Sequence, residues 1–74
     1  MYNEILKEIR KEKGYTQQQI AKVLNTTFQY YSTYESGKRE IPFSRVIELA
    51  DFYNVSIDYI AGRSTEQIVH KKRW

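Results

Sequence analysis

The chain has 74 residues, a formal net charge of +3 at pH 7, one histidine and no cysteine. A chain of this length forms one small domain, and without cysteine it has neither a disulfide framework nor a thiolate metal site. A single histidine cannot build a metal cage, and no apolar run approaches the roughly 18 residues of a membrane-spanning helix. We therefore expect a cytoplasmic protein without membrane contact, metal or cofactor, whose mild positive charge permits nucleic-acid binding without establishing it.

The first helical pattern covers the segment from Tyr2 to Lys13. One face follows the i, i+3, i+4, i+7 spacing, and charged residues fill the remaining surface. The residues of that face are Tyr2, Ile5, Leu6, Ile9 and Lys13. Gly14 follows, and glycine readily takes the left-handed conformation with which many helices end. The pattern predicts a helix that stops at Gly14.

Threonines predict the start of the next two helices. Thr16 can accept a hydrogen bond from a free backbone N–H group, and Gln19, three residues later, can complete a capping box. Thr27 is a second favourable N-cap, and residues 25–27 alone connect the two helices. Asn25 suits this short turn because asparagine tolerates the left-handed region. The side chains expected to face inward are Ile20, Ala21 and Leu24, and those expected to face outward are Gln17, Gln18 and Lys22.

The third helix lies in "TFQYYSTYESGK", residues 27–38, which is unusually rich in aromatic residues. At about 100° per residue, Tyr31 and Tyr34 lie on one side of this helix, where we expect them to join the core. The opposite side is expected to hold Phe28, Gln29, Ser32, Thr33 and Ser36. Gly37 is expected to end the helix.

Pro42 marks the start of the fourth helical pattern, because a proline in the first turn loses no hydrogen bond. The pattern is broadly apolar and predicts a central helix. The residues of its apolar stripe are Phe43, Val46, Ile47, Leu49, Ala50, Phe52 and Tyr53. Ser56 then caps a short fifth helix, which Gly62 closes.

The segment after Gly62 has its own capping signal, Ser64 with Gln67, and a cationic last turn. A short extra helix is an option here, although isolated helices of this length rarely hold. Together the patterns predict an all-α, compact five-helix bundle over residues 1–62. Residues 63–74 form a tail with two interpretations, a short helix or a segment that contributes to dimerisation.

The second and third helices, joined by a short turn, have the spacing of a helix-turn-helix. Further motifs accompany them: "TQ" at 16–17, "IA" at 20–21, "YESGK" at 34–38, "LA" at 49–50 and "VSIDY" at 55–59, with Arg10 and Pro42. With these motifs, the segment from about Ile5 to Gly62 resembles the phage repressor/Cro-type helix-turn-helix family, also called the xenobiotic-response-element family. The resemblance implies five packed helices, of which the third enters the major groove of DNA.

The resemblance also implies roles for individual side chains. The residues expected to contact base edges are Gln17, Phe28, Gln29, Ser32 and Thr33. For Gln17, a contact with a phosphate is the alternative. The residues expected near the DNA backbone are Thr27, Tyr30, Ser36, Lys38 and Arg39. Arg10 and Glu35 are expected to form a structural ion pair that pins the first helix to the reading helix. Tyr30 stays ambiguous, because its ring can pack at the rim of the core while its hydroxyl reaches a phosphate.

General chemistry agrees with these roles. The helix N-termini that follow Thr16 and Thr27 can direct free N–H groups at phosphates. A glutamine can bind adenine in a bidentate manner, and a phenylalanine can cover a thymine methyl group. The reading face contains neither arginine nor lysine. Its composition therefore favours A·T-rich half-sites over guanine-centred recognition.

These features predict a bacterial or phage transcriptional regulator, a repressor that binds a palindromic double-stranded DNA operator as a homodimer, with no small-molecule ligand. The candidate dimer residues are Phe52, Tyr59, Ile60, Ile68, Val69 and Trp74. The alternative is a helix-turn-helix module that binds protein, such as an antitoxin-like partner, and stacking of exposed aromatic residues on RNA is a third option. Catalysis is not expected, because Asp51 and Asp58 are accompanied by no nucleophile, phosphate-binding loop or metal set.

Overall fold

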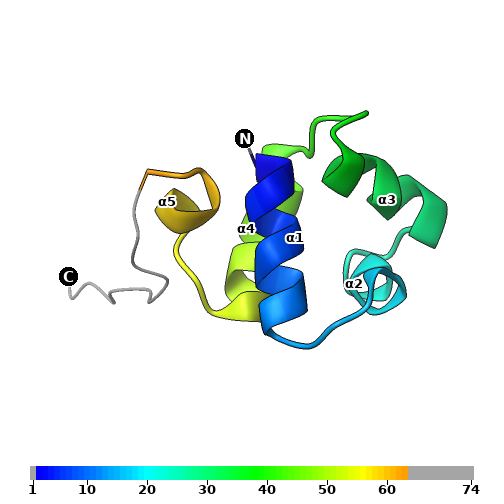
Figure 1. The fold of residues 1–74 in the computed structure, drawn as a ribbon, viewed down its shortest axis with the longest axis horizontal. Coiled ribbons are helices and arrows are strands. Elements are labelled where there is room, and N and C mark those ends of the chain that lie inside the picture. Colours follow the sequence, from blue (N-terminus) through cyan, green and yellow to red (C-terminus); the bar gives the residue numbers. More distant parts are fainter. Residues whose placement is uncertain (1, 64–74) are drawn as a thin grey trace.

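The computed structural model describes residues 2–63, and over that range it contains five α-helices (Figure 1). They are α1 (Tyr2–Glu12), α2 (Gln17–Val23), α3 (Phe28–Ser36), α4 (Phe43–Tyr53) and α5 (Ile57–Ile60). The all-helical five-helix architecture confirms the predicted fold class. The expected Ser64–Gln67 cap, the optional extra helix and the tail candidates Ile68, Val69 and Trp74 lie outside the described residues.

In the view of Figure 1, α1 lies in front of α4 in the middle of the molecule, with α2 and α3 at one end and α5 at the other. Close contacts join α2 to α3, α1 to α3, α4 to α5 and α1 to α5. Because α1 contacts α3 at one end of the molecule and α5 at the other, it connects the α2–α3 corner to the rest of the core.

Side-chain caps fix where three of the helices begin. The Thr16 hydroxyl accepts a hydrogen bond from the Gln19 amide at 3.1 Å, and the Gln19 side chain accepts one from the Thr16 amide at 2.9 Å, which completes the predicted capping box. The Thr27 hydroxyl accepts from the Tyr30 amide at 3.1 Å, and the Ser56 hydroxyl accepts from the Tyr59 amide at 2.9 Å. The caps that the sequence predicts for α2, α3 and α5 are therefore all formed.

Two asparagines in the left-handed conformation turn the chain sharply. Asn25, with φ of 58°, follows α2, and Asn54, with φ of 59°, follows α4. After each of them a backbone amide returns to the preceding helix, from Thr26 to the Ala21 carbonyl at 2.9 Å and from Val55 to the Ala50 carbonyl at 3.0 Å. Asparagine tolerates this region better than most residues, so the turn that positions α3 costs little strain.

The hydrophobic core takes side chains from all five helices, from the C-cap of α2 and from the two segments that flank α4. Its buried members are Leu6, Ile9, Ile20, Ala21, Leu24, Tyr31, Tyr34, Ile41, Val46, Leu49, Ala50, Tyr53, Val55 and Ile60. This set includes every inward-facing residue that the sequence predicts for α2 and α3. The helical phase of the α2–α3 corner is therefore the predicted one.

The predicted apolar stripe of α4 is wrong at its margins. Phe43 is 61% exposed, Ile47 38% and Phe52 40%. The buried stripe consists only of Val46, Leu49, Ala50 and Tyr53. A helix that packs on one side buries a stripe little more than about 100° wide, so the other apolar side chains of α4 reach solvent.

Two further expectations are corrected at the ends of the fold. Helix α1 stops at Glu12, and Lys13 is exposed rather than part of the buried face, since its charged head stays in water. Ile60 is fully buried in the core, with 0% of its surface exposed. A side chain without exposed surface cannot contact a second chain, so Ile60 is wrong as a dimer-interface candidate.

Candidate nucleic-acid interface

Helix α3 lies at the outer edge of the α2–α3 end of the molecule and has two unlike sides (Figure 1). Tyr31, Tyr34 and Glu35 are buried against the other helices. Away from that side, Phe28 is 43% exposed and Tyr30 41%. Gln29 and Ser36 are also exposed, and Ser32 and Thr33 are half-buried. The predicted base-reading residues of α3 therefore share one accessible side of one helix.

A buried ion pair attaches α3 to α1. The Arg10 Nε atom lies 2.7 Å from Glu35 Oε2, and Arg10 Nη2 lies 3.1 Å from Glu35 Oε1, so the pair is bidentate. The two side chains are only 10% and 2% exposed. Arg10 Nη1 also donates to the Tyr15 carbonyl at 2.8 Å, which ties in the segment between α1 and α2. The pair expected from the sequence is present, and it holds the last turn of α3 against α1.

Two more donors complete the surroundings of Glu35. The Tyr31 hydroxyl donates to Glu35 Oε2 at 2.6 Å, and Gln17 Nε2 donates to Glu35 Oε1 at 2.9 Å. Gln17 is half-buried, so the expectation that it faces fully outward is corrected. The contact between Tyr31 and Glu35 could be predicted from the sequence, because residues four apart lie on one helix face. The contact between Gln17 and Glu35 could not, because it depends on how α2 packs against α3.

These contacts determine the charges in the cluster. Burial alone would raise the pKa of Glu35, but hydrogen bonds from Arg10, Tyr31 and Gln17 outweigh it, so its pKa lies below the usual range. The hydrogen bond to Glu35 raises the pKa of Arg10, and burial together with Glu35 raises the pKa of Tyr31. At neutral pH the cluster therefore holds a carboxylate, a guanidinium and a neutral phenol.

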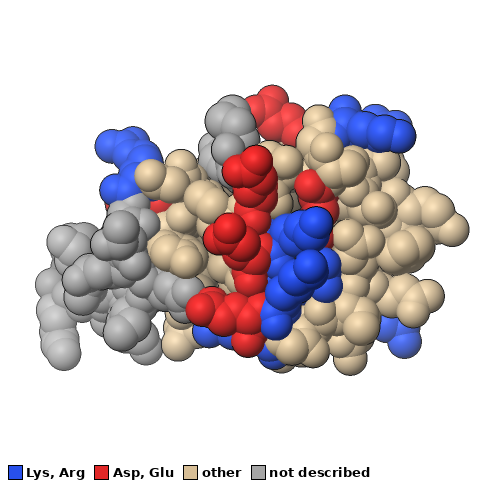
Figure 2. All heavy atoms as spheres, viewed as in Figure 1, with Lys and Arg blue, Asp and Glu red and all other residues tan. Residues whose placement is uncertain are grey.

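Basic side chains follow directly after α3. Lys38 and Arg39 are exposed, and the Arg39 guanidinium carbon lies 4.7 Å from the centroid of the Tyr30 ring. The Tyr30 ring in turn meets the Tyr34 ring edge-on, with centroids 5.6 Å apart. The Tyr30 ring therefore packs at the rim of the core, and a phosphate contact of its hydroxyl stays a prediction. Figure 2 shows basic side chains over this loop, while the surface of α3 beside it carries little charge.

Three hydroxyl groups near the exposed side of α3 have local partners. Thr27 uses its oxygen as the helix cap, Thr33 Oγ1 donates to the Tyr30 carbonyl at 2.6 Å, and Ser36 Oγ donates to the Thr33 carbonyl at 3.2 Å. With their hydrogens directed at the helix backbone, Thr33 and Ser36 keep oxygen lone pairs for an outside donor. The exposed side of α3 is therefore polar but electrically neutral.

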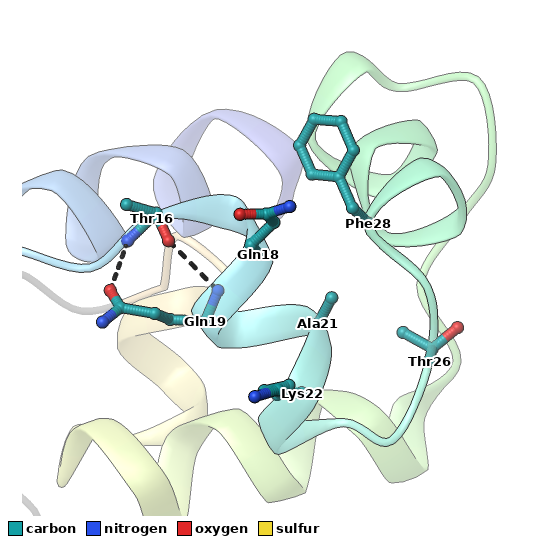
Figure 3. A pocket seen from close by; sticks show the side chains of 7 residues that line it. All are labelled: Thr16, Gln18, Gln19, Ala21, Lys22, Thr26 and Phe28. Atoms are coloured by element: carbon teal, nitrogen blue, oxygen red, sulfur yellow. Dashed lines mark hydrogen bonds between the residues drawn. The ribbon is translucent and has the colours of Figure 1, made fainter.

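An open groove of about 580 Å³ lies between α2 and the start of α3. It is lined by Thr16, Gln18, Gln19, Ala21, Lys22, Thr26 and Phe28 (Figure 3). The Phe28 side chain forms its α3 wall, and Gln18 and Lys22 project from α2 (Figure 3). The sequence did not predict this groove, because it forms only when the two helices cross.

Residues 2–63 contain neither a metal-binding cluster nor a membrane-spanning helix. No group of three or more histidine, cysteine, aspartate or glutamate residues in that range is arranged to hold a metal ion. None of the described helices combines the length and the apolar character that crossing a membrane requires.

Comparison with known proteins places this geometry in a family. The sequence model of the helix-turn-helix family matches residues 6–60. The chain is 39% identical over 69 residues to the uncharacterized HTH-type transcriptional regulator YqaE of Bacillus subtilis (strain 168), an alignment that covers 92% of this chain and 60% of YqaE. It is 40% identical over 58 residues to the HTH-type transcriptional regulator ImmR of the same organism, with 78% of this chain and 46% of ImmR covered.

Similarity extends to a prophage protein and to a solved structure. The SPbeta prophage-derived uncharacterized HTH-type transcriptional regulator YonR of Bacillus subtilis (strain 168) is 40% identical over 60 residues, covering 81% of this chain and 56% of YonR. The crystal structure of a transcriptional regulator from Listeria innocua matches all of this chain and 64% of that one, with a TM-score of 0.78 and 28% identity. The chain thus spans between 46% and 60% of the length of these three curated relatives. By sequence and by fold, the chain belongs to the helix-turn-helix family, in its phage repressor/Cro-type branch.

Proposed function

We propose that the chain binds double-stranded DNA in a sequence-specific manner and regulates transcription, as a repressor that occupies a palindromic operator. The observation that carries the proposal is the exposed side of α3, which is neutral, polar and held rigidly by the Arg10–Glu35 pair, with cations directly after it. The relatives named as HTH-type transcriptional regulators support the same activity. The resemblance to proteins of Bacillus subtilis, one of them prophage-derived, supports a bacterial or phage origin.

In this proposal α3 enters the major groove and its exposed side reads base edges. Gln29 binds adenine through its amide, and Phe28 covers a thymine methyl group. Ser32 and Thr33 complete the reading side as hydrogen-bonding groups. Because this side has no arginine or lysine, the preferred half-site is rich in A·T pairs.

The remaining site residues lie near the DNA backbone in this proposal. Lys38 and Arg39 supply charge to phosphates, and Thr27, Ser36 and the rim residue Tyr30 lie beside them. Gln17 donates one amide hydrogen to Glu35, and its second amide hydrogen can reach a phosphate. Such contacts set affinity and salt dependence rather than sequence choice.

A duplex selection tests the proposal. The protein is incubated with a random pool of duplexes, bound DNA is amplified, and the enriched sequence is measured again at several salt concentrations. We expect an A·T-rich palindrome whose log K falls by about 0.9 per phosphate contacted for each tenfold rise in salt. A pool without enrichment would contradict sequence-specific binding and would favour a protein partner instead.

A further inference from the structure

We infer that Tyr30 is a positioning residue, whose ring holds the Arg39 guanidinium in place for a DNA phosphate, and that its hydroxyl makes no required contact with DNA. The inference rests on the proposed DNA binding and deepens it, because it assigns one phosphate contact to a pair of side chains. Three features carry it: the anchoring of the ring, the anchoring of the loop and the chemistry of the guanidinium.

The Tyr30 ring is anchored from beneath. It meets the Tyr34 ring at 83° with centroids 5.6 Å apart, and Tyr34 is 3% exposed. Tyr34 is itself held, since its ring meets that of Tyr31 with centroids 6.1 Å apart and its hydroxyl accepts a hydrogen bond from Arg45 at 3.2 Å. An exposed ring that stands on a buried one in this way presents a fixed outer face.

The backbone that carries Arg39 is anchored as well. Gly37 takes φ of 85° at the C-cap of α3, and its amide donates to the Tyr34 carbonyl at 3.3 Å. The Arg39 amide then donates to the Thr33 carbonyl at 3.1 Å. Arg39 therefore leaves the loop from a position tied to the last turns of α3, directly above the Tyr30 ring.

The contact between the two side chains suits a guanidinium. Its carbon lies 4.7 Å from the Tyr30 centroid, within the range of a cation–π interaction. A planar guanidinium can stack on a ring and still direct its N–H groups at a phosphate. A free arginine loses side-chain freedom when it binds, and stacking before binding lowers that loss. The ring thus raises affinity through Arg39, not through a contact of its own.

A double-mutant cycle on the selected operator separates the two roles. We expect Tyr30→Phe to bind as wild type, because it keeps the ring. Tyr30→Leu should weaken binding about two- to five-fold, which corresponds to an exposed cation–π contact. In an Arg39→Ala background, Tyr30→Leu should cause no further loss. Arg63→Ala is the matched control, since it removes an exposed cation that follows α5 in the chain, and α5 lies at the end of the molecule opposite α3 (Figure 1).

A second measurement needs no DNA. In wild type and Tyr30→Phe, NMR signals of the Arg39 side-chain δ protons should be shifted upfield by the ring, and Tyr30→Leu should remove the shift. Circular dichroism of each variant checks that α3 stays folded.

Three outcomes count against the inference. Losses that multiply in the double variant, a Tyr30→Phe defect equal to that of Tyr30→Leu, or unshifted Arg39 protons in wild type would each overturn it while DNA binding stands. A wild-type protein that binds no duplex would instead overturn the proposed function, and the phosphate role of Arg39 with it.

Discussion

The Glu35 carboxylate accepts hydrogen bonds from three side chains, Arg10 of α1, Gln17 of α2 and Tyr31 of α3. A buried carboxylate is costly unless it is paired and its lone pairs are used. Here the partners come from three helices, so the charge can be satisfied only when those helices are docked. The cluster therefore favours one arrangement of α1, α2 and α3, and it lies beside the part of the molecule where the exposed side of α3 reaches solvent.

At the residue scale, we expect Glu35→Gln to lower the free energy of unfolding near pH 7 by about 3–5 kcal/mol, because it leaves the Arg10 charge buried without its partner. Urea denaturation followed by circular dichroism measures the difference. Tyr31→Phe, which removes a single donor and keeps the ring, is the milder comparison and should cost about 1.5–3 kcal/mol. Equal stability of Glu35→Gln and wild type would show that the pair contributes nothing.

The same cluster predicts a pH dependence of known sign. The contacts lower the folded-state pKa of Glu35 below the unfolded value of about 4.3. Its contribution to stability is therefore complete above the unfolded pKa and is lost as the pH falls through the lower folded pKa. We expect the stability difference between wild type and Glu35→Gln to stay level near neutral pH and to shrink below about pH 4. A difference that persists unchanged in acid would assign the effect to packing rather than to charge.

At the scale of the element, α3 has a buried and an exposed side. Variants on each side test which residues of the helix face inward. We expect Tyr31→Ala to destabilise the fold by about 2–5 kcal/mol, as large-to-small changes in a core do. Gln29→Ala should leave the melting temperature nearly unchanged and weaken operator binding by about 1–3 kcal/mol. Thermal melting and binding titration of both variants measure the two effects. If they were exchanged, the assigned phase of residues 27–36 would be wrong.

At the scale of the elements, the sequence predicts some structural features and misses others. Caps and left-handed turns depend on neighbouring residues, so Thr16, Thr27 and Ser56 predict the helix starts. Which apolar side of a helix is covered depends on distant segments, and periodicity in α4 could not show that Phe43 and Ile47 reach solvent. The Gln17–Glu35 bond and the stacking of Arg39 on Tyr30 are missing from the sequence-based prediction for the same reason, since both need the packed structure.

At the scale of the whole molecule, charge is unevenly distributed over the face that Figure 2 shows. Acidic and basic side chains lie beside one another along α1, whereas the α2–α3 end is largely neutral with basic side chains at its margin (Figure 2). Neighbouring charges of opposite sign largely cancel at a distance, so α1 contributes little to attraction of a polyanion. The proposed DNA contact therefore depends on a few cations near α3, with a net charge of only +3 over the whole chain. We therefore expect a single chain, with one α3 helix and so few phosphate contacts, to bind DNA with modest affinity.

The last prediction follows from that modest affinity. Two chains whose reading helices lie one helical turn apart on a two-fold site double the base and phosphate contacts, so we expect two copies per palindrome. Among the described dimer candidates, Phe52 is 40% exposed and Tyr59 is half-buried, so both have surface available to a second chain. Sedimentation equilibrium of the chain alone, with a palindromic duplex and with a half-site duplex measures the stoichiometry. One chain per palindrome, with the same affinity as for the half-site, would contradict a homodimer on DNA and leave a monomeric reader. Two chains that bind the palindrome more tightly than two independent half-sites would show that contact between the copies stabilises the complex.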